Sequence, residues 1–217
     1  MAVTGTTRLL GPSDARAAAT IDAEARAGDF LPSLGGDFLE VLYSQLLRGG
    51  SSWGHGMSAP SGELLGFVVG SIDSELVFKD LSPARNAPMF VATARALLKK
   101  PAAIVRMVES LFYTSRESVG DVKAELIVIG TRHDVRGGGI GGRLVEALAA
   151  EFVQRGIPRY RVTVKEKNEA ALRFYARHGF EPASQFRLYG EGWRVLVADP
   201  AAQLAATGAR AARAESP

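Results

Sequence analysis

The sequence has no cysteine, few aromatic residues and no long apolar run, and each shortage excludes a class of protein. Without cysteine there is no disulfide scaffold, no thiolate zinc site and no cysteine nucleophile. Aromatic residues make up 8% of the chain and are rarely interleaved with basic ones, which argues against nucleic-acid binding. The apolar runs 64–72 and 126–129 fall far short of the roughly 20 residues that span a bilayer, so we expect no membrane segment.

Charge of one sign is also scarce. The 26 basic and 23 acidic residues leave a net charge of +3, without a block of like charges that would indicate a nucleic-acid partner. The three histidines, His55, His133 and His178, are scattered without metal-ligand spacing, so we expect no metal. Residues 1–7 lack the basic and apolar regions of a signal peptide, and we expect a cytoplasmic protein.

The length of 217 residues, 47% of them hydrophobic, is enough to bury the core of one domain. The first half predicts a short strand at 6–10, a helix that begins at an N-cap at Ser13, a loop at 29–36 and a second helix at 37–48. Apolar strands follow at 52–57 and 64–72. Turn residues separate these two strands, which predicts an antiparallel hairpin.

The second half alternates strands with helices, which favours α/β layering. Strands are predicted at 125–131 and 160–164, helices at 140–154 and 168–178, and a hairpin at 186–197.

The segment between the halves, residues 74–119, holds several prolines and two helical stretches. The second stretch has apolar residues on one face, namely Ile104, Val108, Leu111 and Phe112. The tail from residue 200 is rich in alanine, and both a frayed helix and disorder remain open for it.

The most informative segment runs from Glu125 to Gly142, where a strand leads through a charged loop into a glycine cluster and then an amphipathic helix. Five of the six residues 137–142 are glycine, which leaves backbone N–H groups uncovered. Together with the unpaired N–H groups and the dipole of the helix N-terminus, they predict a cradle for a phosphate or pyrophosphate. Arg136 adds a positive charge at its mouth. The alternative is a loop that merely turns the chain.

Two common phosphate-binding motifs fit this segment poorly. A P-loop requires a lysine followed by serine or threonine after the glycines, but Arg143 follows Gly142. Gly137, Gly139 and Gly142 match G-x-G-x-x-G, yet a dinucleotide-binding motif has its first glycine at the strand end, and here residues 132–136 intervene.

A third motif matches in detail. The run from Arg136 to Gly141 fits the R/Q-x-x-G-x-G/A signature of the GNAT superfamily of acetyl-CoA-dependent N-acetyltransferases, which the chain resembles over residues 125–180. A second block follows at the expected distance and resembles that family's N-x-x-A-x-x-[LF]-Y-x-x-x-G-F pattern. Its matching residues are Asn168, Ala171, Phe174, Tyr175, Gly179 and Phe180.

The resemblance implies an α/β (α+β) fold with a mixed, mostly antiparallel central sheet flanked by helices. Two parallel strands, 125–131 and 160–164, would splay apart in this sheet. Residues 1–199 would form a single GNAT-like acetyltransferase domain with a helical insertion at about 74–119, followed by the alanine-rich tail at 200–217.

Acetyl-CoA is the cosubstrate that the resemblance implies, with its pantetheine arm along the splayed strand and its pyrophosphate on the glycine loop. The residues implied in binding it are Ile129, Gly130, Thr131, Arg136, Gly137, Gly138, Gly139, Ile140, Gly141, Gly142 and Asn168. For Asn168, a plain helix N-cap is the alternative.

Two residues are candidates for catalysis. A free alkylamine is protonated at pH 7, so a base must take its proton, directly or through water. Glu125 stands where several members of the family carry a glutamate base; the alternative is a surface carboxylate at a strand start. Tyr175 matches the tyrosine that protonates the departing CoA thiolate; the alternative is an aromatic residue that packs on the sheet. The implied route is direct attack by a primary amine in a ternary complex.

The acceptor is expected opposite CoA, between the loops 29–36 and 189–193, where Asp29 or Asp37 would attract a cationic amine. Two roles are open for the insertion: it caps the acceptor pocket or forms the surface of a homodimer. The expected partner is a small-molecule or protein amine. The second hypothesis is a non-catalytic acyl-CoA-binding sensor or interaction module of the same fold, but the presence of Glu125 and Tyr175 favours the enzyme.

Overall fold

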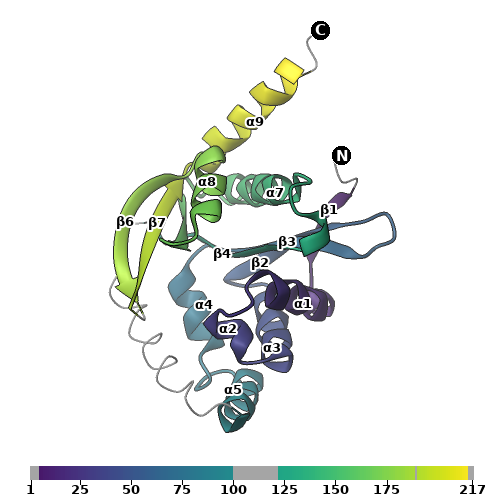
Figure 1. Ribbon diagram of the computed structural model, residues 1–217, viewed down its shortest axis with the longest axis vertical. Helices are drawn as coiled ribbons and strands as arrows, with labels where there is room; N and C mark the ends of the chain where they lie inside the picture. The colour runs from purple at the N-terminus through teal and green to yellow at the C-terminus, as the bar shows by residue number, and fades with distance from the viewer. Residues whose placement is uncertain (1–4, 100–121, 189, 215–217) are drawn as a thin grey trace.

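The computed structural model describes residues 5–99, 122–188 and 190–214 (Figure 1). In chain order the elements are β1 (Thr6–Leu10), the 3-10 helix η1 (Pro12–Asp14), α1 (Ala15–Ala25), α2 (Phe30–Ser33), α3 (Gly36–Leu46), β2 (Ser52–Ser58), β3 (Leu64–Ser71), α4 (Ser74–Leu81), α5 (Ala87–Lys99), β4 (Glu125–Thr131), the 3-10 helix η2 (His133–Val135), α7 (Ile140–Gln154), β5 (Tyr160–Lys165), α8 (Glu169–Arg177), β6 (Glu181–Leu188), β7 (Glu191–Ala198) and α9 (Pro200–Ala214).

The strands form a seven-stranded sheet in the order β1-β2-β3-β4-β5-β7-β6. Each pair of neighbours is antiparallel except β4 and β5, which run parallel. The predicted fold class, a mixed and mostly antiparallel sheet flanked by helices, is therefore confirmed.

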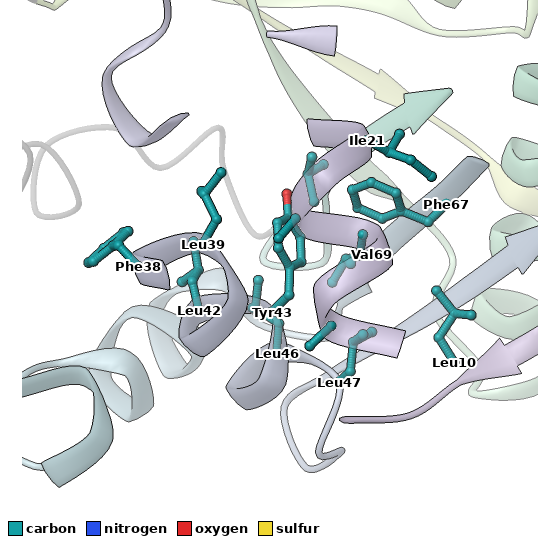
Figure 2. Packing of buried hydrophobic residues seen from close by; sticks show 14 of the residues in the cluster. Leu10, Ile21, Phe38, Leu39, Leu42, Tyr43, Leu46, Leu47, Phe67 and Val69 are labelled. Atoms are coloured by element: carbon teal, nitrogen blue, oxygen red, sulfur yellow. The ribbon is translucent and has the colours of Figure 1, made fainter. Parts of the chain in front are cut away.

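Helices cover both faces of the sheet. Figure 1 shows α1 to α5 on one face and α7 and α8 on the other, with α9 extending away beyond them. On the first face, α1 and α3 pack together and against β3, and Ile21, Tyr43 and Phe67 lie in this core (Figure 2). On the second face, Leu144 and Leu148 of α7 lie in a separate buried cluster with β5 and α8. The sheet thus separates two hydrophobic cores.

Strand β4 contains a β-bulge near its centre. Leu126 pairs with Gly70 of β3 and Val128 pairs with Val69, so that Ile127 is an extra residue between them. Because of this extra residue, Leu126 belongs to the α7-side core whereas Val128 belongs to the core under α1 and α3. The bulge therefore changes which face of the sheet the following side chains of β4 reach.

Two local predictions near the N-terminus are wrong. Ser13 does not cap the first helix, because η1 precedes α1 and the Asp14 carboxylate accepts the Gly11 N–H at 3.0 Å. A charged acceptor makes a stronger hydrogen bond to that N–H than a hydroxyl does. The predicted loop at 29–36 contains the short helix α2, since Pro32 falls in its first turn, where a missing N–H costs nothing.

Near the C-terminus, the structure differs from the prediction in the length of two elements. Strand β6 begins at Glu181 rather than near residue 186. Pro182 and Ser184 have low strand propensity, so the sequence does not predict a strand there, but an edge strand accepts both residues. The tail forms α9, and its Gln203 is buried. The helices α3, α7 and α8 and the β2–β3 hairpin agree with the prediction.

The helices α4 and α5 occupy the first part of the predicted insertion. The second predicted stretch, with Ile104, Val108, Leu111 and Phe112, lies outside the described residues. Within the described ranges, none of the helices combines the length and the apolar character that crossing a membrane requires.

Candidate active site

The parallel strands β4 and β5 pair over two residues and then separate. Glu125 is opposite Arg161 and Leu126 is opposite Val162, and the ladder ends there in the part of the chain that the structure describes. Beyond this point β4 stays paired with β3, and β5 stays paired with β7. Among the described residues, the inner edges of the two strands have no strand partner beyond this point, and their backbone N–H and C=O groups can bind an extended ligand.

At the end of β4 the chain enters the glycine loop, residues 136–142. Gly137 and Gly139 have φ angles of 81° and 83°, a left-handed conformation that side chains with a Cβ rarely adopt. Gly139 is the N-cap of α7. The first intrahelical hydrogen bond is the one that the Arg143 N–H donates to the Gly139 carbonyl, at 3.3 Å. The preceding N–H groups of the helix start have no intrahelical acceptor. Arg136 is exposed beside them. These features fit a pyrophosphate.

The last two glycines of the loop also serve a packing role. A Cβ on Gly141 would lie 3.1 Å from the Phe174 ring, and a Cβ on Gly142 would lie 2.9 Å from His178 Nε2. The absence of side chains at Gly141 and Gly142 therefore lets α8 approach the start of α7. The sequence predicts both glycines as ligand contacts and does not predict this second role.

The phenol of Tyr175 is carried by α8 into the core near the strand gap. Asn168 begins this helix, with its Oδ1 atom accepting the Ala171 N–H at 3.1 Å, and Gly179 follows its end with a φ of 78°. Tyr175 is 5% exposed and belongs to the same buried cluster as Val162 of β5, with Ile129 of β4 packed against that cluster. Burial raises the pKa of Tyr175, so its hydroxyl keeps its proton.

Glu125 lies on the opposite face of the sheet from Tyr175, at the closed end of the gap. Its carboxylate accepts a hydrogen bond from Arg161 Nε at 3.0 Å and one from Thr163 Oγ1 at 3.2 Å. Arg161 also donates to Ser74 Oγ at 2.9 Å, which ties α4 to the pair. The Glu125 and Arg161 side chains are 13% and 15% exposed. Glu125 is thus held in place rather than free on the surface.

A second group of charges lies at the open end of the gap. Lys165 at the end of β5 binds Asp29 at 2.8 Å and Glu191 of β7 at 3.0 Å, and its Nζ atom is 5.5 Å from the centre of the Trp193 ring. Burial acts to lower the pKa of Lys165, but its hydrogen bonds to the two carboxylates raise it. Lys167 also binds Glu191. These contacts join the loop after α1, the end of β5 and the start of β7.

Sequence analysis missed a buried ion pair on α1. Asp22 is fully buried, and its two oxygens accept hydrogen bonds from Arg26 Nε at 2.5 Å and Arg26 Nη2 at 2.8 Å. The Tyr43 hydroxyl interacts with both residues, and burial together with the Asp22 charge raises the pKa of Tyr43. A signal was present in the sequence: Asp22 continues the buried spacing of Ala15 and Ala19 on an otherwise apolar helix face.

The predicted residues fall into several places. The glycine loop and Arg136 lie at the N-terminus of α7, Ile129 and Tyr175 share one core, and Glu125 lies on the other face. Asn168 caps α8 on the surface. The Asp37 carboxylate is 96% exposed and pairs with Lys99 at 3.8 Å, away from the gap. No group of residues suited to hold a metal ion occurs in the described ranges.

Comparison with known proteins gives one family. A sequence model described as the acetyltransferase (GNAT) family matches residues 47–180, more than half of the chain. Among curated proteins, the 5-NmdU N-acetyltransferase of Pseudomonas phage PaMx11 is 37% identical over 81 residues, which are 37% of this chain and 55% of that protein. The match therefore spans about half the length of this curated relative.

Solved structures share the fold at low sequence identity. The ribosomal-protein-S18-alanine N-acetyltransferase of Escherichia coli has a TM-score of 0.57 and 17% identity, over 90% of this chain and 94% of that one. A spermidine N-acetyltransferase chimera from Vibrio cholerae and hSSAT has a TM-score of 0.58 and 17% identity, over 92% and 98% of the two chains.

Proposed function

Since the chain belongs to the GNAT family of acetyltransferases, we propose that it transfers the acetyl group of acetyl-CoA to a primary amine by direct attack in a ternary complex. One observation carries this proposal most strongly. The gap between β4 and β5 opens directly before the glycine loop, and the buried Tyr175 packs in the core that borders it. A site for an extended phosphate ester thus adjoins a group that can donate a proton.

The residues that would hold acetyl-CoA form a continuous path. The free inner edge of Ile129, Gly130 and Thr131 would pair with the pantetheine amides, and the N–H groups of the glycine loop would bind the pyrophosphate. Acetyl-CoA supplies an activated acetyl thioester when bound. The capping role of Asn168 supports an indirect contribution, because it fixes where α8 starts.

The chain's own residues would then move two protons. The Tyr175 hydroxyl would donate its proton to the departing thiolate sulfur, a role supported by burial that keeps the phenol protonated. The Glu125 carboxylate would receive the proton of the amine through a water molecule. The hydrogen bonds that it accepts from Arg161 and Thr163 hold this carboxylate in a fixed orientation at the closed end of the gap.

The proposed acceptor is a small-molecule or protein amine. The names of the similar proteins include a protein alanine and spermidine as acceptors, so an amine panel should contain peptide, polyamine and nucleoside amines. The charged side chains at the open end of the gap are the feature that bears on the choice of acceptor.

Calorimetric titration with acetyl-CoA, followed by an assay of thiol release with the amine panel, tests the proposal. We expect acetyl-CoA binding and thiol release that depends on the amine. No binding would contradict the assignment of the glycine loop. Binding without thiol release on any amine would instead support the second hypothesis, a non-catalytic acyl-CoA-binding module.

A further inference from the structure

Most charged side chains around the two ends of the gap are paired with one another. The carboxylate of Asp29 binds Lys165, that of Glu191 binds Lys165 and Lys167, and that of Glu125 binds Arg161. Each of these acids is therefore neutralised by a cation of the chain itself. A cationic acceptor would have to displace one of these partners, which argues against the cationic acceptor expected from Asp29 and Asp37.

Arg26 differs from these cations because its carboxylate partner is fully buried while Arg26 itself is partly exposed. Asp22 takes the edge formed by Nε and Nη2, and the Tyr43 hydroxyl interacts with the same group. A guanidinium has five N–H donors, so donors remain after these contacts. The Arg26 side chain is 32% exposed, whereas Asp22 is fully buried behind it. Arg26 is therefore the partly accessible member of this ion pair.

The neighbours of Arg26 along the chain lie near the gap. Helix α1 packs on β4, with Ile21 close to Gly130, and Arg26 follows directly at the C-terminus of the helix. Asp29, three residues later, binds Lys165 at the end of β5. Residue 26 thus lies between β4 and the end of β5. Burial raises the pKa of Tyr175, and the charge of Arg26 acts on it in the opposite direction.

We propose that Arg26, oriented by Asp22, is a specificity-determining residue that binds an oxyanion, a carboxylate or a phosphate, carried by the amine acceptor. A guanidinium whose one edge is held by a carboxylate is well suited to bind two oxygens with its other edge. This inference rests on the proposed function, since it names the chemical class of the acceptor.

Matched pairs of amines test the inference. Each pair has an acceptor with the anion and one without it: γ-aminobutyrate and its amide, and phosphoethanolamine and ethanolamine. We expect the wild-type enzyme to have at least a tenfold lower KM for one anionic member than for its neutral counterpart. Which pair shows the difference separates a carboxylate from a phosphate. Equal KM values within both pairs would overturn the inference while leaving the acetyltransferase proposal intact.

Arg26→Gln should remove this preference by raising the KM of the anionic amine at least tenfold, with little change for the neutral amine and for acetyl-CoA binding. Arg16→Gln, on the exposed face of the same helix, is the matched control and should change neither. Because Arg26→Gln leaves Asp22 buried without a cation, the double variant Asp22→Asn/Arg26→Gln provides a neutral replacement. An equal rise of KM for both members of a pair would assign Arg26 a structural role instead. If none of the amines causes the wild-type protein to release thiol, the proposed function and this inference both fail.

Discussion

The Glu125 carboxylate and the Arg161 guanidinium meet at 3.0 Å across one of the two residue pairs that join β4 to β5. Both side chains are largely buried, so this ion pair fixes the carboxylate at the point from which the strands diverge. The pair connects the architecture of the sheet to the proposed proton transfer. Glu125 thus has two roles, as the proposed base and as a partner in the ion pair, and substitutions can distinguish them.

Glu125→Gln should lower kcat by about 10²-fold or more, because general-base catalysis contributes about 10²–10⁴-fold. The amide can still accept a hydrogen bond from Arg161 or Thr163, so acetyl-CoA affinity should not change. Steady-state kinetics with a fixed amine measures the effect. Arg161→Gln is the comparison: it removes the partner but keeps the carboxylate, and should retain more activity than Glu125→Gln. The reverse order would show that the ion pair, rather than the carboxylate, is what activity requires.

Tyr175→Phe should reduce kcat by about 10²-fold while acetyl-CoA still binds, since the ring and its packing remain and the proton donor is lost. Tyr160→Phe is a matched control. Its hydroxyl is also buried and donates to Gln203 Oε1 at 2.7 Å, so its loss should lower stability by about 1 kcal/mol and leave kcat nearly unchanged. Thiol-release kinetics and thermal unfolding of both variants provide the comparison. Full activity of Tyr175→Phe would remove tyrosine from the mechanism.

Gly142→Ala should weaken acetyl-CoA binding by displacing α8, because the new Cβ would meet His178 Nε2 at 2.9 Å. The His178 ring has little freedom to move, since its Nδ1 atom is 2.7 Å from the Phe174 carbonyl. Gly11→Ala is the control, since a Cβ at that position meets no atom within 4 Å. Calorimetry and thermal unfolding measure both effects. An unchanged affinity and melting temperature would contradict the packing role of Gly142.

Stability should fall at alkaline pH. Burial raises the pKa values of Tyr43, Tyr160 and Tyr175, so these phenols keep their protons in the folded state when the unfolded chain loses them. Below the ordinary tyrosine pKa of about 10 both states are protonated, and stability should not depend on these groups. Above it, each buried tyrosine should lower the free energy of unfolding by about 1.4 kcal/mol per pH unit.

Chemical unfolding from pH 9 upward measures this slope. Tyr160→Phe should have a shallower slope than the wild type, which separates the tyrosine contribution from that of lysines that titrate in the same range. An identical slope would mean that the Tyr160 phenol ionises equally in the folded and unfolded chain.

The parts of the fold that sequence predicted well are those set by local chemistry. Three features each depend on a few neighbouring residues: the spacing of apolar residues in α7, the Asn168 cap and the glycine after α8. The structure agrees with the prediction of all three. The assignments of Glu125, Tyr175 and the acetyl-CoA contacts stay predictions, because they concern a bound molecule.

Other features could not be predicted because they depend on residues distant in the sequence. The bulge at Ile127 arises from the pairing of β4 with β3, and the role of Gly142 depends on where His178 lies. Asp22 is different: its place on a buried helix face was visible in the sequence, but its partner Tyr43 belongs to another helix. Only the folded chain brings these groups together.

The extra residue in β4 has a consequence for how this strand can vary. Side chains before and after Ile127 face different cores because one residue is unpaired, so the strand depends on its length as well as on its composition. A substitution at Ile127 changes one contact. Deleting Ile127 would remove the bulge and leave Leu126 and Val128 on their present faces, whereas deleting a paired residue of β4 would turn the side chains on one side of it to the opposite face. The bulge is therefore the position of β4 at which a deletion would keep the other side chains of the strand on their present faces.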